Sequence, residues 1–442
     1  MSITAIVFIA IYSTGLFLTF YRPYYGVLTY IFEWHNHPPY YWWGDELPDL
    51  RWSYTIALVT LISFLIHRNQ IKQIEAPNYR PAIWIGLMVV NMFVVSSSFA
   101  VFPDISFDKT YEVAKTLIFF LLLISLVKSY KDYQLLIWVI ILSVANMGLT
   151  ALGGSNRDIG VIAPNATEEN ALSAHILAIL PFMGIYMMRA KRWGKILIAL
   201  SIPLCLNLII LANSRATIVG LLAIGFLSIF LVKGKFRIAV VAGLIVGAFV
   251  FFQLTNDAFN ERQKTDTYDD GSATSRLWIW KGGLKMWKDH PMGVGGGGFV
   301  ELSQEYIPEI DKPKSQHNTF VAILTDWGFI GILLYLGFLI HIFKITFEVK
   351  RLAKIPELKK YQLEATAVQL ALVGLIAAGM FHSRQYSEVV YWLSAFAIIL
   401  QTIQKNELAE LQAAEADISE QEIQPITTTG NGLPAIYQQG LE

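Results

Sequence analysis

The chain has 442 residues, and its 34 Lys and Arg residues balance 34 Asp and Glu residues, so the formal net charge at pH 7 is zero. Hydrophobic residues make up 54% and charged residues 15% of the chain, and its mean hydropathy is +0.47. An ordinary soluble domain carries about a quarter charged residues, so this composition excludes that class and predicts a polytopic membrane protein. The balanced charge argues against a nucleic-acid partner, and the single cysteine, Cys205, excludes a disulfide within the chain.

Apolar runs that are long enough to cross about 30 Å of hydrocarbon, at about 1.5 Å per residue, recur along the chain. The run at 52–66 is short, and the aromatic stretch 24–32 before it is interpreted either as a span or as an interfacial or re-entrant segment. We therefore expect an all-α polytopic membrane protein with about twelve transmembrane helices, within a range of eleven to thirteen. The twelve predicted spans are residues 2–20, 52–66, 82–101, 110–127, 135–151, 171–188, 196–212, 217–232, 238–254, 319–343, 363–381 and 389–403.

The orientation of these spans is predicted from Lys and Arg, which remain on the cytoplasmic side of short loops. One alternating set of short loops holds eighteen of these residues and the other set holds six. This asymmetry predicts that both termini are cytoplasmic and that the loops with few basic residues are extracytoplasmic. The six residues in those loops are Arg22, Arg51, Lys109, Arg157, Arg215 and Arg384.

A polar segment of about sixty residues interrupts the apolar pattern between Leu254 and Phe320. We interpret residues 1–404 as one transmembrane catalytic domain, whose extracytoplasmic loop covers about 255–318 and contains interfacial helices. The tail at 405–442 is rich in Glu, Gln and Ala and poor in apolar residues, which predicts a disordered cytoplasmic segment. The large loop is where we expect reactive groups to meet water at the bilayer surface.

Three residues at this surface suit a reaction on a phosphorylated substrate. Arg215 begins an apolar run, where its guanidinium can bind a phosphate with two hydrogen bonds; the alternative is an arginine that anchors its helix at the interface. Arg276 lies near the start of a predicted amphipathic helix, whose dipole favours an anion. His317 precedes the span after the large loop, and an imidazole, with an ordinary pKa of about 6.5, suits a general base. The alternative for His317 is a histidine at a helix start without a catalytic role.

Other polar groups are predicted near the same surface. Lys281, with Lys285 and Lys288, lies on the polar side of the amphipathic helix, where contacts with lipid headgroups are the favoured interpretation. His382 and Arg384 form another outer cluster that is expected to line the same cavity. The glycine run 295–298 is interpreted either as a phosphate-binding nest or as a flexible turn.

No metal site is predicted. Two adjacent carboxylates, Asp269 and Asp270, do not make one, and His35 and His37 lack a third ligand nearby. A nucleotide-binding motif is also missing from the sequence, so we expect no cofactor.

Short motifs follow one another between residues 165 and 337. They are Glu169-Asn170-Ala171; Ser214-Arg215-Ala216; Ser275-Arg276 with Trp280; Asp289-His290-Pro291-Met292-Gly293-Val294-Gly295 with Phe299; and His317-Asn318 with Asp326-Trp327-Gly328-Phe329-Ile330-Gly331. In this order and spacing they resemble the O-antigen ligase and polymerase superfamily of bacterial envelope polysaccharide assembly. One departure is Asp326, where relatives often have Glu.

The first part of the chain resembles one branch of that superfamily, the probable O-glycosylation ligases associated with exosortase systems. The residues that carry this second resemblance are Arg22-Pro23, Gly26, Tyr30, Pro38 and Trp43-Gly44.

The resemblance implies a metal-independent, inverting glycosyl transfer at the periplasmic side of the bacterial inner membrane. The implied donor is an undecaprenyl-pyrophosphate-linked glycan, the acceptor is a hydroxyl of lipid A-core or of a protein, and membrane lipids surround the enzyme. By this similarity Arg215 and Arg276 bind the leaving pyrophosphate, and His317 activates the acceptor. The further residues expected to bind substrate are Asn170, Asn318, Lys281, His382 and Arg384.

Two alternatives remain open at this point. A polymerase of the same superfamily would use the same chemistry to extend the glycan on its carrier. A transporter or flippase predicts charged or helix-breaking residues near the middle of several spans, whereas charges inside the predicted spans are few, with Glu112 and Lys115 in one of them.

Overall fold

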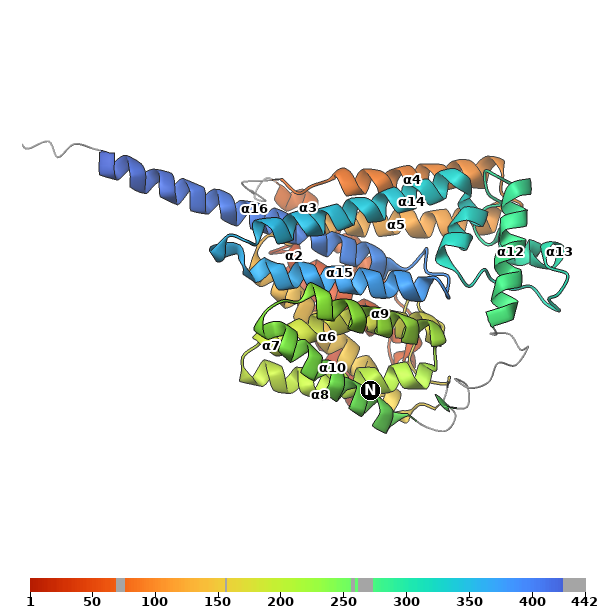
Figure 1. Cartoon of the computed structure of the whole chain (residues 1–442), viewed down its shortest axis with the longest axis horizontal. Helices are drawn as coiled ribbons and strands as arrows, with labels where there is room; N and C mark the ends of the chain where they lie inside the picture. The colour runs from red at the N-terminus through yellow and green to blue at the C-terminus, as the bar shows by residue number, and fades with distance from the viewer. Residues whose placement is uncertain (69–75, 156, 256–258, 261–272, 424–442) are drawn as a thin grey trace, which may run out of the picture.

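The computed structural model describes residues 1–68, 76–155, 157–255, 259–260 and 273–423, and within these ranges it is all-helical, with no β-strand (Figure 1). Each of the twelve predicted spans coincides with a helix, which confirms the all-α fold. These helices are α1 (Ile3–Thr19), α3 (Trp52–His67), α4 (Arg80–Ser98), α5 (Pro103–Leu126), α6 (Tyr130–Thr150), α7 (Glu169–Arg189), α8 (Arg192–Ala212), α9 (Arg215–Leu231), α10 (Lys235–Leu254), α14 (Thr319–Leu352), α15 (Lys360–Gly379) and α16 (Glu388–Ile423).

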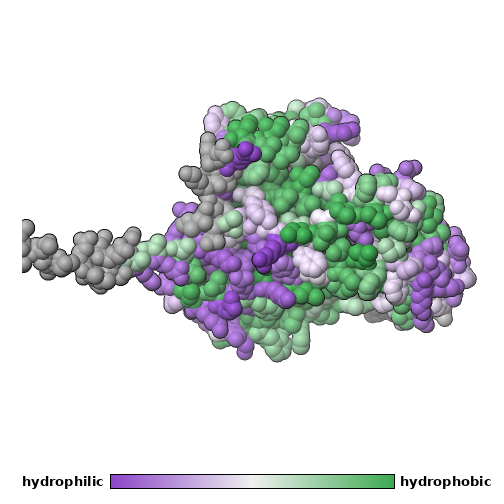
Figure 2. Space-filling model, turned by 90° about the horizontal axis from the view of Figure 1, so that it is seen from above, coloured by the Kyte–Doolittle hydropathy of each residue, from purple (hydrophilic) through white to green (hydrophobic). Residues whose placement is uncertain are grey.

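Seven of the described helices are long and apolar enough to cross a membrane, namely α4, α6, α7, α8, α10, α14 and α15. Helices α1, α3 and α9 are apolar but shorter, while α5 and α16 belong to neither group. The chain is therefore a membrane protein with several spans, and the number twelve stays a prediction. Figure 2 shows hydrophobic residues over the middle of the bundle and hydrophilic residues toward both of its ends.

The centre of the bundle is formed by helices that are buried on all sides. Helix α15 packs against α7, α9, α14 and α16, and most of its side chains are buried. Gly220 of α9 allows the closest approach, because a Cβ atom there would lie 2.8 Å from the carbonyl oxygen of Gly374 in α15. Small residues permit such close packing where lipid gives no hydrophobic drive between helices. The opposite case is α10, which has no buried residue and lies at the periphery.

One end of the bundle is marked by α12 (Ala273–Asp289) and α13 (Gly298–Tyr306), and we call it the α12 end. In Figure 1, α12 runs across the direction of the long helices, as expected for a helix that lies in the plane of the membrane surface. A helix is therefore present where the amphipathic helix was predicted, and it packs against α14 and α13; its place at the membrane surface stays a prediction.

The stretch 24–32, left open by the sequence, belongs to a buried helix, α2 (Tyr24–His35), which packs between α1 and α3. Its first turn lies at the end opposite to α12, since the hydroxyl of Tyr24 donates to the carbonyl of Asp132 just after α6 begins. Its last residue, His35, contacts His175 near the start of α7, at the α12 end. Helix α2 therefore returns the chain to the end from which α1 started.

This return contradicts the prediction that both termini lie on one side. The amino terminus contacts Glu46, in the loop that follows α2 at the α12 end. At the other end of the bundle, Glu407 of α16 pairs with Lys360 at 2.7 Å. The prediction failed because a helix of twelve residues is too short to be recognised as a span by length.

The carboxy-terminal tail was expected to be disordered from Lys405, but α16 continues to Ile423. Glu, Gln and Ala are good helix formers, and the ion pairs Lys405–Glu348 at 3.1 Å and Lys360–Glu407 at 2.7 Å hold this part of α16 against the bundle. The expectation for 424–442 lies outside the described residues.

Candidate active site

Five helix ends converge at the α12 end of the bundle. They are the starts of α7, α9, α14 and α16 and the end of α15. The starts of α7 and α9 are joined by a buried hydrogen bond of 2.7 Å between the hydroxyls of Ser173 and Thr217. The start of α14 is joined to the end of α15, because Nδ2 of Asn318 donates to the carbonyl of Met380 at 3.0 Å. Residues that are far apart in the sequence are thereby fixed around one place.

Helix α12 brings Arg276 to this place. Two glycines let α12 lie close to its neighbours, since a Cβ atom at Gly282 would lie 2.3 Å from Ile307 and one at Gly283 would lie 2.8 Å from Val321 of α14. One turn apart on α12, the guanidinium of Arg276 and the ring of Trp280 both contact Phe381, at 5.6 Å and 6.1 Å from its ring centre. Phe381 directly precedes His382, so Arg276 lies beside the loop between α15 and α16.

Arg215 is the first residue of α9, after a tight turn in which Asn213 has a left-handed φ of 48° and Ser214 caps the helix by accepting from the N–H of Thr217. Arg276 is close enough to feel its charge: burial, and then the charge of Arg215, lower the pKa of Arg276 from its ordinary value. The structure therefore brings together the two arginines that were predicted to act as a pair. Two guanidiniums that repel one another in a partly buried site favour an anion between them.

His317 occupies the residue before the cap of α14, with a left-handed φ of 47°. Few residues other than glycine adopt this conformation, and asparagine, aspartate and histidine are the main exceptions. The next residue holds the turn, because Oδ1 of Asn318 accepts from the N–H groups of Phe320 at 2.9 Å and Val321 at 3.1 Å. The imidazole of His317 stacks over that of His382, with ring centres 6.4 Å apart and an angle of 29° between the planes.

The loop between α15 and α16 carries the predicted residues His382 and Arg384. Thr319 fixes the loop, since its hydroxyl donates to the carbonyl of His382 at 3.1 Å and accepts from the N–H of Arg384 at 2.9 Å. Burial, followed by the charges of Arg384, His317 and Arg276, lowers the pKa of His382 to about 3. His382 is therefore neutral at ordinary pH and lies within reach of all three of these groups.

Several polar atoms of this loop have no hydrogen-bond partner among the described residues. Arg384 is only 6% exposed, and burial lowers its pKa to about 10; its Nη2 donates to Ser387 at 2.8 Å, while its Nε is unsatisfied. The hydroxyl of Ser383 and Oε1 of Gln385 are unsatisfied as well. Buried polar groups in native proteins are nearly always paired, so this loop has the character of a ligand site.

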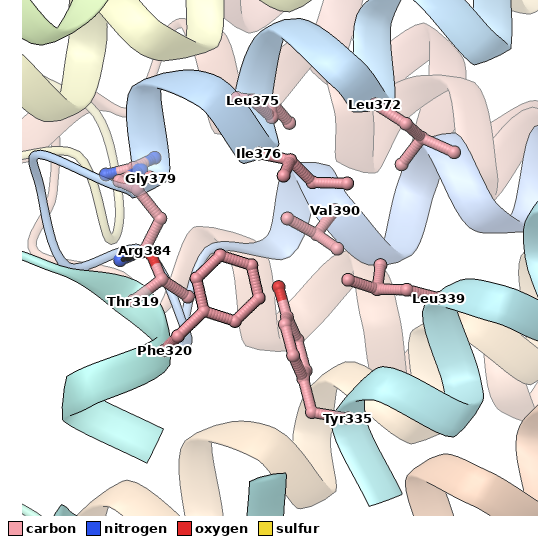
Figure 3. A pocket seen from close by; sticks show the side chains of 10 residues that line it. All are labelled: Thr319, Phe320, Tyr335, Leu339, Leu372, Leu375, Ile376, Gly379, Arg384 and Val390. Carbon is pink, nitrogen blue, oxygen red and sulfur yellow. Dashed lines mark hydrogen bonds between the residues drawn. The ribbon is translucent and has the colours of Figure 1, made fainter. Parts of the chain in front are cut away.

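Arg384 also lines a pocket between α14, α15 and α16. Figure 3 shows Arg384 and Thr319 at one end of it, the hydroxyl of Tyr335 directed inward, and the apolar side chains of Leu372, Ile376 and Val390 along the rest. The pocket thus has a cationic end and an apolar end, and its free space is about that of one water molecule.

The remaining predicted residues are placed less centrally. Asn170 is half-buried in the first turn of α7, near the start of α9. Lys281 is exposed on α12. Both ends of the Asn318 amide are bound within the protein, so the structure gives this residue a positioning role. Substrate contact by these three residues stays a prediction.

The glycine run has a structural use. The N–H of Gly295 donates to the carbonyl of Asp326 at 2.9 Å and that of Gly296 donates to the hydroxyl of Ser106 at 3.0 Å. Gly293 has a left-handed φ of 96°, and a Cβ atom there would lie 2.5 Å from the carbonyl oxygen of Asp326. These N–H groups are directed into the protein, which favours the interpretation as a turn over that of a phosphate nest. The turn fits against the break in α14 at Gly328, whose φ is 69°.

The sequence did not indicate which residue links the start of α14 to the loop between α15 and α16. The buried carboxylate of Asp326 accepts from Nε2 of Gln316 at 2.9 Å and from the hydroxyl of Tyr386 at 3.2 Å. Gln316 precedes His317, and Tyr386 follows Arg384 by two residues. Asp326 stood within a motif, but only the tertiary contact reveals what its carboxylate holds.

Glu168, also not identified from the sequence, lies beside the same loop, with its Oε2 3.9 Å from Nε2 of His382. Since His382 is neutral, this is a contact of a carboxylate with an uncharged imidazole rather than an ion pair.

No group of three or more His, Cys, Asp and Glu residues within the described ranges is arranged to hold a metal ion. Asp269 and Asp270 lie outside the described residues. His35 bonds to His175, with 2.9 Å between their Nε2 atoms, and His37 pairs with Glu33.

Comparison with known protein families supports the resemblance that the sequence motifs suggested. Residues 200–336 match the family model described as O-antigen ligase, a segment that runs from α8 to the middle of α14 and includes Arg215, Arg276 and His317. No curated protein matches the chain. This match supports a membrane enzyme of the ligase and polymerase kind over a transporter. Over these residues the chain is similar to the O-antigen ligase family, as its motifs predicted.

Proposed function

We propose that the chain is a ligase that transfers a glycan from an undecaprenyl-pyrophosphate carrier to a hydroxyl of lipid A-core or of a protein. The transfer takes place at the α12 end, which we assign to the periplasmic face of a bacterial inner membrane. The observation that carries this proposal is that Arg276 and His317 come together at His382, while Arg215 lies close enough to Arg276 for its charge to act there.

The two arginines suit the leaving group. When the bond between the anomeric carbon and the phosphate oxygen breaks, the electron pair stays with the pyrophosphate, and its negative charge grows in the transition state. Fixed cations placed where charge develops lower the barrier, because they need no reorganisation. Arg215 and Arg276 are such cations, and a guanidinium can bind a phosphate through two parallel hydrogen bonds.

His317 suits the incoming hydroxyl. As the acceptor oxygen forms its bond to the anomeric carbon, its proton passes to an imidazole nitrogen of His317, and attack from the face opposite to the pyrophosphate inverts the anomeric centre. General-base catalysis of this kind contributes about 10²- to 10⁴-fold. No step requires a metal or a nucleotide, because the lipid-linked donor is already activated.

The apolar side of the site suits a lipid carrier. The pocket beside Arg384 is lined by Leu339, Leu372, Leu375, Ile376 and Val390, between helices of the bundle. Because this pocket has room for only about one water molecule, we place the polyprenyl chain along the apolar outer face of the bundle beside it, with its pyrophosphate at the surface with the arginines.

The experiment uses the purified full chain in lipid nanodiscs, with lipid-linked glycan as donor and lipid A-core as acceptor. Asn tolerates a left-handed φ, so His317→Asn removes the base and keeps the turn. We expect transfer to fall by about 10² or more. The matched control is His67→Asn, at the opposite end of the bundle, which should transfer at the wild-type rate.

The products of the same reaction test the assignment as a ligase. Glycan attached to the acceptor supports it, while longer glycans that stay on the carrier would assign the chain to the polymerases. Undiminished transfer by His317→Asn would overturn the role of His317.

A further inference from the structure

Glu168 lies close to the cationic groups of the candidate site, and its side chain does not cap the helix that it precedes. It occupies the cap position of α7 but forms no capping hydrogen bond there. Its side chain is 67% exposed, and its carboxylate lies 3.9 Å from Nε2 of His382. A glutamate that capped the helix would have its oxygen at the N–H groups of the first turn, so this side chain is directed toward the loop between α15 and α16 instead.

The groups that face Glu168 carry the charge that an anionic ligand needs. Glu168 is close enough to Arg384 for its negative charge to act on that guanidinium. Arg276 and His317 are also close enough to act on His382. The neighbouring Glu169 differs, because its carboxylate is engaged by Arg157 at 3.5 Å.

We propose that Glu168 is a built-in competitor for the diphosphate: its carboxylate weakens the hold of Arg384 and its neighbours on the spent carrier and so speeds release of that product. This inference rests on the proposed function, since it assumes that a diphosphate binds at this loop. It goes further by assigning an opposing role to a residue outside the catalytic set.

The physical reason is the high affinity for diphosphate that the site would have without such a competitor. A loop with a buried arginine and several unsatisfied polar atoms, next to a pair of arginines, would bind a diphosphate tightly before and after transfer. Equal binding of substrate and product does not accelerate turnover, and product release often limits the rate of an enzyme. A carboxylate at contact distance from His382 repels both phosphates and lowers the affinity for each.

The exposure of Glu168 makes the proposal testable with little risk to folding. Glu168→Gln keeps the size of the side chain and removes its charge, while Glu168→Asp keeps the charge. Glu169→Gln is the matched control, since it removes one negative charge from the next residue, whose carboxylate is engaged by Arg157. Thermal unfolding of all variants should stay close to that of the wild type.

The experiment measures binding of inorganic pyrophosphate to the full chain in nanodiscs of neutral lipid by isothermal titration calorimetry. We expect Glu168→Gln to bind about fivefold or more tightly, as the removal of a like charge several ångströms from a multiply charged ligand predicts. Glu168→Asp and Glu169→Gln should bind within about twofold of the wild type. In transfer assays, Glu168→Gln should keep its rate in the first turnover and slow in later turnovers.

The outcomes separate the two proposals. If the wild type binds no pyrophosphate at millimolar concentration, the proposed anion site itself fails. If the wild type binds it but Glu168→Gln binds equally or more weakly, the anion site stands and the competitor role of Glu168 is wrong. An equal gain in Glu169→Gln would show a general effect of net charge and would also overturn the inference.

Discussion

Gln316 donates a hydrogen bond from Nε2 to Oδ1 of Asp326 at 2.9 Å, and this contact ties the residue before His317 to the broken part of α14. The hydroxyl of Tyr386 donates to the other carboxylate oxygen at 3.2 Å, so one buried group holds two segments of the site. Asp326 reaches the candidate base only through Gln316, which makes it a positioning residue.

Replacing this carboxylate should disturb the site more than it disturbs the bundle. Asp326→Ala leaves the hydroxyl of Tyr386 without an acceptor, at a cost of about 1 to 3 kcal/mol, and leaves the amide of Gln316 with only the hydroxyl of Thr325 at 3.2 Å. Asp326→Asn keeps one acceptor oxygen and should retain more activity than Asp326→Ala. A positioning role predicts that kcat falls while KM for the lipid-linked donor changes little. A loss confined to thermal stability, with kcat intact, would contradict it.

The arginine pair should not tolerate lysine. Arg276→Lys keeps one positive charge but removes the planar fork that binds phosphate oxygens in pairs. We expect kcat/KM to fall by about 10² or more, as for removal of one preorganised donor to developing charge. Lys285→Arg, on the exposed side of α12, is the control for helix stability.

If the two arginines bind one diphosphate together, their effects will not add. The double variant Arg215→Lys, Arg276→Lys should then lose less than the product of the two single losses. Losses that multiply would instead place the two guanidiniums on separate groups.

Most of the bundle was predictable because the membrane imposes a simple rule. A helix has to satisfy its own backbone in hydrocarbon, so long apolar runs mark the helices almost directly. The rule fails for α2, which is short and shielded by its neighbours, with Gly26 approaching Thr60 of α3. The same omission misplaced Arg22, which pairs with Asp132 at 2.6 Å on the basic end of the bundle. Moving Arg22 to the other set changes the count of basic residues from eighteen against six to nineteen against five.

The placement of Arg215, Arg276 and His317 at one end of the bundle was predictable, since each begins a helix or lies near a helix start and all fall within short motifs; their role in a site stays a prediction. The arrangement around His382 was less accessible. His382 and its three neighbours, His317, Arg276 and Glu168, lie in four different segments of the chain. Their separation in the sequence does not indicate that they are close in space. The role of a charged side chain in a loop can be inferred only when its neighbours in space are known.

Conservative substitutions of Asn318 test whether this residue positions the site or binds the substrate. Asn318→Asp keeps the oxygen that accepts from Phe320 and Val321, and aspartate is as good a cap as asparagine. Asn318→Ala removes the cap and should cost about 1 kcal/mol of stability. If the role is positioning, activity should follow stability across these variants. If Asn318→Asp stays fully stable yet loses activity, the cap is not the cause of the loss. The loss would then come from the missing amide donor, which binds the carbonyl of Met380 in this structure or would bind the substrate.

His382 makes the response to acid predictable in sign. In the folded protein its pKa is about 3, because burial and the charges of Arg384, His317 and Arg276 oppose protonation, whereas an unfolded histidine titrates near 6.5. Between these two values the unfolded chain binds a proton that the folded chain does not. The free energy of unfolding should therefore fall as the pH drops from about 6.5 toward 3, and stay unaffected by this residue above that range.

His382→Gln removes this titration, so its apparent Tm should fall less than that of the wild type between pH 7 and pH 4. The same charges give a second consequence. A bound diphosphate neutralises Arg384 and Arg276, which removes the part of the opposition to a proton on His382 that these charges cause, so binding in the acid range should take up protons. Calorimetry of pyrophosphate binding in buffers of different ionisation enthalpy measures that uptake directly. Uptake that persists unchanged in His382→Gln would assign the proton to another group, and His317 is then the next to test.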